Sequence, residues 1–173
     1  MTRAPDLLAE LFFAGDGEIV GRIRLQKIAY LLQQKAGRRD LFFTYHHYGP
    51  YSRELAEALD RAVILEEIDE KSRDTDYGTT YSIFHWKKRV RREKEAVGPI
   101  SMTEAKPIMA RLKKEPAVIL ELAATIHWLI HKEQAKDWES ELKIRKKLKS
   151  TPENIGRAKT VLRDLGLDQG LAA

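Results

Sequence analysis

The sequence predicts a mainly α-helical protein with a small antiparallel β-hairpin, and three patterns support this fold class. Apolar residues recur in several segments at the three- and four-residue spacing of a helix. Serine and threonine stand at helix-start positions, and glycine follows several expected helix ends. Two β-prone runs between residues 65 and 84 flank a polar loop, as in a hairpin. We therefore expect an N-terminal winged-helix-like lobe packed on a C-terminal helical lobe.

The N-terminal part of the chain supplies three helices and the hairpin. The first helix is expected over 5–14, where a Gly-Asp-Gly turn ends it. The second, 21–37, places apolar residues on one face and Arg and Gln residues on the other. An aromatic, β-prone segment follows, broken by Gly49-Pro50. Ser52 can then cap the third helix. The hairpin strands are expected at 65–70 and 79–84.

Four further helices are expected in the C-terminal part, over 101–114, 116–131, 134–149 and 151–166. Ser101 and Glu104 form the capping-box pattern at the start of the first. Thr151 and Pro152 mark the start of the last. The helix over 116–131 is apolar nearly all round, which is typical of a central buried helix.

These elements divide the chain into a lobe over 1–86, a basic connector over 87–95 and a helical lobe over 96–168. The very apolar helix must be covered on several sides, so the two lobes are expected to share one core. A single domain over 1–168 is the alternative, and 173 residues suffice for either arrangement.

Composition and charge limit the class of protein. The chain has no cysteine, which excludes disulfides and thiolate chemistry and suits the cytoplasm. No apolar run approaches the roughly 20 residues that span a bilayer, so no membrane partner is expected. The net charge of +5 is uneven. Residues 1–86 carry 11 Lys and Arg against 14 Asp and Glu, whereas 87–173 carry 20 against 12. The basic half could meet an acidic partner, or could be a solvated face.

Two stretches resemble a known family. They are residues 21–32, Gly-Arg-Ile-Arg-Leu-Gln-Lys-Ile-Ala-Tyr-Leu-Leu, and residues 45–55, Tyr-His-His-Tyr-Gly-Pro-Tyr-Ser-Arg-Glu-Leu. The chain resembles the YwgA-like family and, more distantly, the Panacea (SocA-like) antitoxin domain. The resemblance implies a compact, helix-rich fold and, for the Panacea branch, neutralisation of a toxin by direct binding. This chain has Gly-Pro-Tyr-Ser where those antitoxins tend to have Gly-Pro-Val.

A dense group of aromatic residues is the candidate partner-binding site. Its members are Phe42, Phe43, Tyr45, Tyr48 and Tyr51. Alternation along an extended segment can bury only about half of them in one core. The others would be anchors for a protein partner, a toxin among the candidates. Alternatively, the aromatic residues pack the seam between the lobes. The expected function is protein–protein recognition, antitoxin-like or as a regulatory adaptor.

A winged-helix regulator that binds DNA is the alternative function. The helix after Ser52 would enter the major groove, yet its polar positions sum to a net charge of −1, which phosphates repel. Weak, non-specific phosphate binding could come from basic residues elsewhere. The candidates are Arg89, Arg91, Arg92, Lys146 and Lys147.

Catalytic and cofactor patterns are weak. His127 and His131 have a spacing that can share a metal, but no third ligand is adjacent and the segment is apolar, so no metal is expected. His46 and His47 lie near Ser52, for which helix capping is the better explanation. The chain lacks a Gly-rich phosphate loop and a dinucleotide fingerprint. We therefore expect a protein without a cofactor or enzymatic activity.

Overall fold

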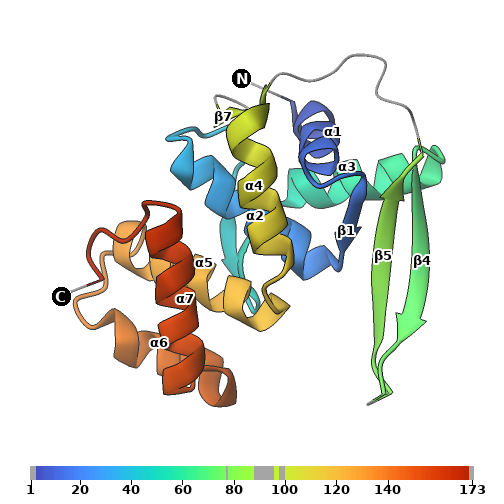
Figure 1. Cartoon of the computed structure of the whole chain (residues 1–173). Helices are drawn as coiled ribbons and strands as arrows, with labels where there is room; N and C mark the ends of the chain where they lie inside the picture. Colours follow the sequence, from blue (N-terminus) through green and yellow to red (C-terminus); the bar gives the residue numbers. More distant parts are fainter. Residues whose placement is uncertain (1–2, 77, 88–95, 98–99, 172–173) are drawn as a thin grey trace.

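The computed structural model describes residues 3–76, 78–87, 96–97 and 100–171. These residues form a mainly helical molecule with three small antiparallel sheets (Figure 1). The N-terminal elements are α1 (Ala4–Ala14), β1 (Glu18–Val20), α2 (Arg22–Lys35), β2 (Thr44–His46), β3 (Gly49–Tyr51), α3 (Arg53–Ile64), β4 (Ile68–Asp74) and β5 (Thr80–Trp86). The C-terminal elements are β6 (Ala96–Val97), β7 (Ile100–Ser101), α4 (Met102–Lys113), α5 (Ala117–His131), α6 (Trp138–Lys146), the 3-10 helix η1 (Lys147–Lys149) and α7 (Pro152–Asp164).

The expected hairpin is present as β4 and β5, and β1 joins it to form a sheet in the order β1-β5-β4. Both strands lie slightly further along the chain than the sequence predicts. Strand β1 was not expected, because three residues are too few to show an alternating pattern. It pairs antiparallel with the base of β5, Ile19 opposite Phe84, and both side chains are fully buried.

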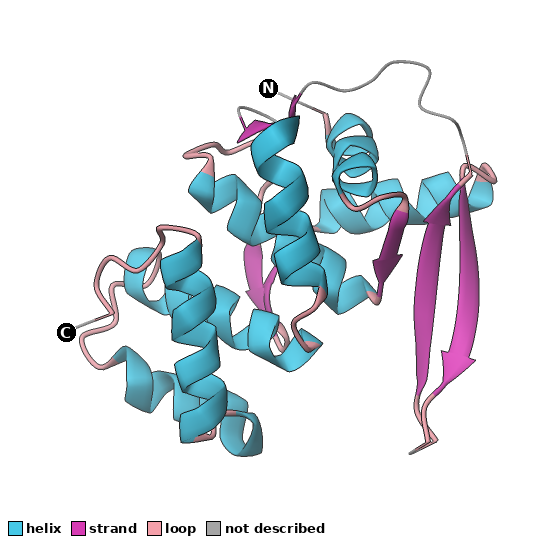
Figure 2. Ribbon diagram, in the orientation of Figure 1, coloured by secondary structure: helices cyan, strands magenta, loops and turns pink. Residues whose placement is uncertain are grey.

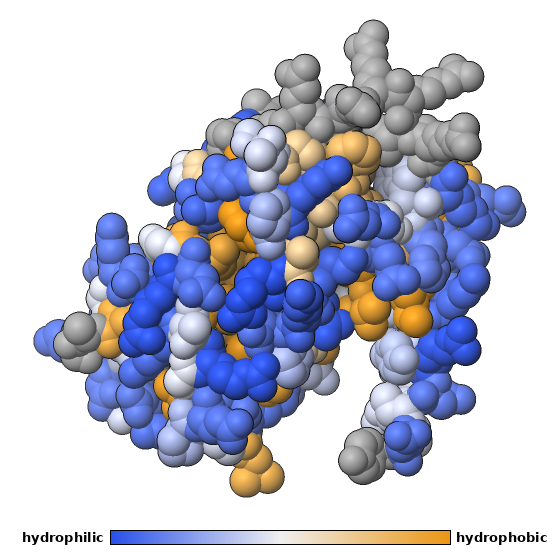
Figure 3. All heavy atoms as spheres, viewed as in Figure 1, coloured by the Kyte–Doolittle hydropathy of each residue, from blue (hydrophilic) through white to orange (hydrophobic). Residues whose placement is uncertain are grey.

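The β4–β5 hairpin forms an arm that leaves the body of the molecule (Figures 1 and 2). Its base is buried at Ile68 and Phe84, whereas the far half of β4, from Lys71 to Asp74, is exposed. In Figure 3 the projecting part is separated from the helices and is mostly hydrophilic. At the base, the Arg22 guanidinium lies over the Phe84 ring and contacts Glu70 at 3.4 Å. The arm is therefore anchored at its base alone.

Helix α5 is the central element, as its apolar sequence predicts. It packs against α2, α6, α7 and β3, and most of its side chains are buried. Residues from both predicted lobes belong to the same hydrophobic core, including Leu25 and Leu55 on one side and Ile126 and Leu162 on the other. Most of the predicted connector, residues 88–95, lies outside the described residues. In the described part of the chain no helix has both the length and the apolarity needed to cross a bilayer.

Helix starts agree with their capping residues. Ser52, Ser101 and Thr151 each accept a hydrogen bond from the backbone amide three residues ahead. The basic helix expected over 134–149 is shorter, because Asp137 caps it and Lys147 has a positive φ of 46° that ends it. The aromatic segment differs most from expectation: Gly49 and Pro50 do not simply break the chain but begin the strand β3.

Candidate functional site

The aromatic segment folds into a hairpin whose two strands, β2 and β3, have three residues each. Thr44 faces Tyr51, Tyr45 faces Pro50 and His46 faces Gly49. Gly49 has a φ of 84°, a region that favours glycine. A Cβ atom at this position would also lie 2.7 Å from the Thr125 Oγ1 on α5. The tight turn and the close approach to α5 therefore both require glycine here.

Polar side chains of α2 bind the outer edge of β3. The Gln26 side-chain amide donates to the Ser52 carbonyl at 2.9 Å, and its oxygen accepts from the Ser52 amide at 2.8 Å. The Lys27 Nζ donates to the Pro50 carbonyl at 2.6 Å. Both side chains are buried, so these bonds are shielded from water. Helix α2 thus occupies the place of a third strand beside β3.

A second glutamine holds the start of the same segment. The Gln33 side chain donates to the Leu41 carbonyl at 3.0 Å and accepts from the Leu41 amide at 2.7 Å. Gln26 and Gln33 are seven residues apart, two helical turns, and so lie on one face of α2. The aromatic segment is therefore bound to α2 at both ends.

A buried charge cluster lies beneath the hairpin. The Glu121 carboxylate on α5 contacts the ammonium groups of Lys146 at 3.0 Å and Lys149 at 2.9 Å. Lys146 also donates to the His47 carbonyl at 2.8 Å, which joins the cluster to the β2–β3 turn. Three lysines, Lys27 included, interact with the single carboxylate of Glu121. Burial lowers the pKa of Lys27 to about 7; the attraction of Glu121 opposes this, and the repulsion of Lys146 and Lys149 adds to it.

An aromatic cluster joins α2, α5 and the hairpin. The Tyr30 ring contacts Phe43, His127 and Trp128, and Trp128 contacts Tyr45. The Tyr30 hydroxyl lies 2.9 Å from Nδ1 of His127. Burial lowers the pKa of His127 to about 3, with smaller contributions from His131 and Lys132. Burial also raises the pKa of Tyr30, so a neutral imidazole accepts from a protonated phenol.

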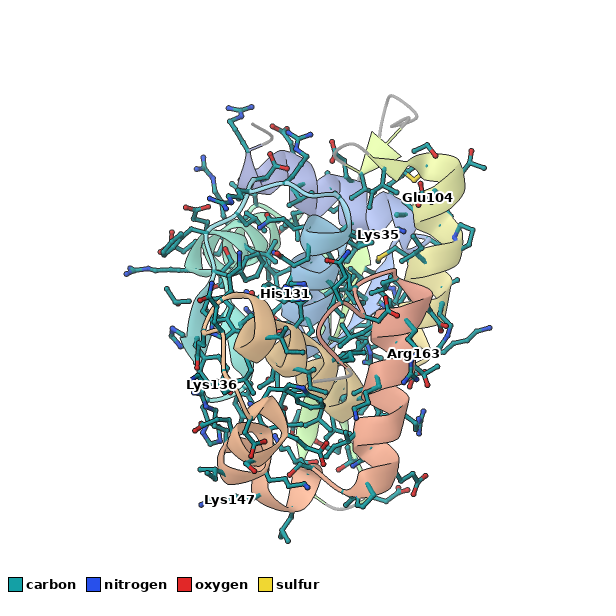
Figure 4. The ribbon with its side chains drawn as sticks, turned by 90° about the vertical axis from the view of Figure 1, so that its left-hand side faces the viewer. Lys35, Glu104, His131, Lys136, Lys147 and Arg163 are labelled. Carbon is teal, nitrogen blue, oxygen red and sulfur yellow. The ribbon has the colours of Figure 1, made fainter. Side chains whose placement is uncertain are left out.

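The two histidines with metal-like spacing have neighbouring rings, whose centroids lie 4.4 Å apart and whose planes are tilted by 34°. His131 is exposed at the end of α5, as Figure 4 shows, whereas His127 is buried beside Tyr30. Among the residues that the structure describes, no group of three or more His, Cys, Asp or Glu side chains could hold a metal ion. The Ser52 hydroxyl is buried at the start of α3, where it accepts from the Leu55 amide at 3.4 Å.

The five candidate partner-binding aromatics occupy different environments. Phe42 is 72% exposed and Tyr48 46%, whereas Phe43 is 8% exposed. Tyr45 and Tyr51 are half-buried. The Arg145 guanidinium covers the Tyr45 ring at 4.7 Å, and the Lys149 ammonium lies 4.9 Å from the Tyr48 ring. Some of these aromatics therefore pack the interior, while Phe42 and Tyr48 present their rings to solvent.

Two hollows lie beside this hairpin. The larger, about 760 Å³, is lined by the consecutive residues 39–45 together with Trp128 and Lys132 of the α5 end; we call it the aromatic groove. The smaller, about 400 Å³, lies between His46–Gly49, Tyr51 and the first turns of α2. Residues of the hairpin line both hollows.

Of the five candidate phosphate ligands, the structure describes Lys146 and Lys147. Lys146 is buried in the Glu121 cluster, so its ammonium is not presented at the surface. Lys147 is exposed at the end of α6, as Figure 4 shows. Arg89, Arg91 and Arg92 lie outside the described residues. Of the five, Lys147 alone is both described and accessible.

Several polar residues hold the hairpin in a role that was not predicted from the sequence, where Lys146 was expected to bind phosphate. They are Gln26, Lys27, Gln33, Glu121, Lys146 and Lys149. One signal was present: Glu121 is the single acid in the otherwise apolar stretch of α5, and a buried acid needs a cationic partner. Which lysines supply it could not be foreseen, because Lys27 and Lys146 come from distant parts of the chain.

Comparisons with known proteins give two relatives. The chain is 31% identical over 148 residues, 81% of its length, to the DNA ADP-ribosyl glycohydrolase of Thermus aquaticus. That match spans only 39% of the glycohydrolase. The chain is also 26% identical over 159 residues, 88% of its length, to the uncharacterized protein YwgA of Bacillus subtilis, and this match spans 91% of YwgA. No family model matches the chain. The similarity to YwgA thus extends over most of the chain.

Proposed function

We propose that this chain is a non-enzymatic protein-recognition module, antitoxin-like or a regulatory adaptor, that binds one protein partner with the β2–β3 hairpin. The observation that carries this proposal is the exposure of Phe42 and Tyr48 on a backbone fixed by buried hydrogen bonds. Aromatic anchors bring a large contact area, and a fixed backbone loses little conformational entropy on binding. Such a surface favours protein recognition.

Charge favours a basic partner, such as a toxin that acts on nucleic acid. The loop and strand from Glu66 to Asp76 contain six acids and two bases. On the exposed side of α3, Arg53 is paired with Glu57 at 2.7 Å, and Asp60 contacts Arg22 at 2.6 Å. The acids of the β4–β5 arm would attract a basic protein during its encounter with the chain.

The alternative function is that of a winged-helix DNA-binding regulator. The order of α1, β1, α2, α3, β4 and β5, with the strands arranged β1-β5-β4, supports a winged-helix-like N-terminal lobe. The exposed side of α3, however, offers DNA no unpaired arginine but Arg61. We therefore favour a fold of this type that serves protein binding. We expect this protein recognition to take place in the cytoplasm, because the chain has no cysteine.

The Thermus relative raises a second candidate function, since its name describes an enzyme that acts on ADP-ribosyl groups of DNA. This chain spans 39% of that enzyme, whereas it spans nearly all of YwgA. We infer that the shared unit serves recognition. Incubation of the purified chain with ADP-ribosylated DNA should release no ADP-ribose above the buffer control. Steady turnover would assign catalysis to this unit instead.

The proposed partner to test is the protein encoded by the neighbouring reading frame. Co-expression with the chain shows whether a complex forms, and isothermal titration calorimetry of the two purified proteins measures its affinity. Phe42→Ala and Tyr48→Ala should each weaken the complex about 30-fold, which is the effect of a residue worth about 2 kcal/mol. Ile64→Ala is the matched control, because Ile64 is 78% exposed but lies at the end of α3. Unchanged affinity in both aromatic variants would contradict the proposed surface.

A further inference from the structure

The two edges of the β2–β3 hairpin differ. On the β3 side, the Pro50 carbonyl binds Lys27, and both main-chain groups of Ser52 bind Gln26. The Pro50 carbonyl therefore points away from β2. In an antiparallel pair, two residues opposite each other turn their main-chain groups either both inward or both outward. Because Tyr45 faces Pro50 in this register, its amide and carbonyl point away from β3.

The outward edge of β2 is open. Apart from the ladder to β3, no described residue bonds the main chain of Thr44, Tyr45 or His46. Thr44 and His46 are exposed, and no described side chain hydrogen-bonds this edge as Gln26 and Lys27 bind the other. Free strand edges pair readily with another extended chain, and proteins usually protect them with charges, proline or a cover. Here the neighbours on the chain, Phe42 and Phe43, are apolar.

This edge faces a groove that suits an extended segment. The aromatic groove is lined by the consecutive residues 39–45, which include Thr44 and Tyr45 of β2. Its opposite side is formed by Trp128 and Lys132 of α5. An added strand would place alternate side chains toward Phe43 and Trp128 and the others toward solvent. The groove therefore selects for an apolar residue at every second position.

The charges at the rim indicate the remaining chemistry. Arg39 and Lys132 are exposed and form no ion pair with another described residue. Of the two acids that line the groove, Asp40 is paired with Arg38 at 2.9 Å, which leaves Glu54. Two cations against one acid favour a segment that carries carboxylates.

We propose that the open edge of β2 binds an extended segment of a protein partner as an added strand, with apolar residues alternating with acidic ones. This inference rests on the proposed protein recognition and names its mode. Main-chain hydrogen bonds to Tyr45 supply affinity, and the aromatic groove with Arg39 and Lys132 supplies specificity.

A displayed library of random ten-residue peptides, selected against the full chain, tests this proposal. Enriched peptides should alternate apolar and acidic residues. N-methylation of alternate amides in such a peptide, in the register that faces β2, should weaken binding at least about tenfold, since it removes donors and obstructs strand pairing. Tyr45→Pro, which removes the outward amide, should weaken binding similarly, whereas Tyr45→Phe should leave it unchanged.

Circular dichroism establishes whether Tyr45→Pro is folded. If it is not, the affinity of the wild-type chain for the N-methylated peptide decides the test. The proposal is overturned if no peptide is enriched, or if enriched peptides bind equally well after N-methylation. The proposal is also overturned if the chain is a dimer in solution and Tyr45→Pro is a monomer. In that case a second copy of the chain occupies the open edge of β2. If Phe42→Ala no longer binds the product of the neighbouring reading frame but folded Tyr45→Pro still does, strand addition is refuted while the proposed protein recognition stands.

Discussion

The β2–β3 and β4–β5 hairpins differ in length, in composition and in what holds them. The β4–β5 arm has seven-residue strands, and the far half of β4 is exposed and mostly charged. The β2–β3 hairpin has three-residue strands, yet buried lysines of α2 and α6 bind its main chain, and Glu121 of α5 pairs with the α6 lysine. The long hairpin depends on its own ladder, whereas the short one depends on the rest of the molecule. This difference supports our proposal that the short hairpin, and not the arm, is the recognition surface.

The largest expected effect concerns the charge cluster under the short hairpin. Glu121→Gln leaves Lys146 buried without its carboxylate, and losing one partner of a buried pair costs about 3–5 kcal/mol. Asp76→Asn, at the exposed tip of the arm, makes the same chemical change and should alter the free energy of unfolding by less than about 0.5 kcal/mol. Urea denaturation of the two variants compares them. Equal effects would show that the cluster does not support the hairpin.

Two glycines with positive φ offer a second comparison, Gly49 at 84° and Gly78 at 74°. An alanine at either position adopts a left-handed conformation that costs about 1–2 kcal/mol. At Gly49 its Cβ also meets the Thr125 Oγ1 at 2.7 Å, whereas at Gly78 it meets nothing within 4 Å. Gly49→Ala should therefore destabilise by about 1–3 kcal/mol more than Gly78→Ala.

Thr125→Ala is the control for this contact, because the Thr125 hydroxyl is buried and has no hydrogen-bond partner among the described residues. Adding it to Gly49→Ala should recover part of the lost stability in thermal melts. A double variant no more stable than Gly49→Ala would show that the strain lies in the backbone alone.

Lys27 should make the stability depend on pH. Its pKa is about 7 in the folded protein, against 10.5 as a free side chain. Between these values the unfolded chain binds more protons, so the free energy of unfolding should rise with pH, by up to about 1.4 kcal/mol per unit. Lys27→Met removes this group and should flatten the curve between pH 7 and pH 10.5. Lys71→Met on the exposed arm should keep the wild-type slope.

Losing the cap of α3 should have the smallest effect. Ser52→Ala removes the acceptor for the Leu55 amide, which typically costs about 0.5–2 kcal/mol. The bonds between Gln26 and the Ser52 main chain remain, so the hairpin should keep its position. Chemical shifts of Tyr45 and Tyr51 in NMR spectra would test this. Large shifts at both would mean that the hydroxyl, and not Gln26, holds the strand.

The difference between the hairpins also explains what the sequence could predict. The helices and the arm have long periodic patterns and clear caps, such as Ser101 and Thr151, and these signals are local. The β2–β3 hairpin has no such pattern, since its stability comes from Lys27, Gln26 and Lys146, which are distant in the chain. Its aromatic character could be seen, and the division between exposed Phe42 and buried Phe43 follows from alternation. The open edge of β2 could not be foreseen without the register.

The closed edge of β3 has a consequence for stoichiometry. Because Gln26 and Lys27 occupy the main-chain groups of Ser52 and Pro50, the small sheet can grow in one direction alone. Fibrils require two usable edges on each copy, so that every added copy offers a new site. With this hairpin, one chain can take up a single strand, or two chains can close on each other through β2. The side chains of α2 thereby limit the hairpin to one added strand and prevent the sheet from growing into a fibril.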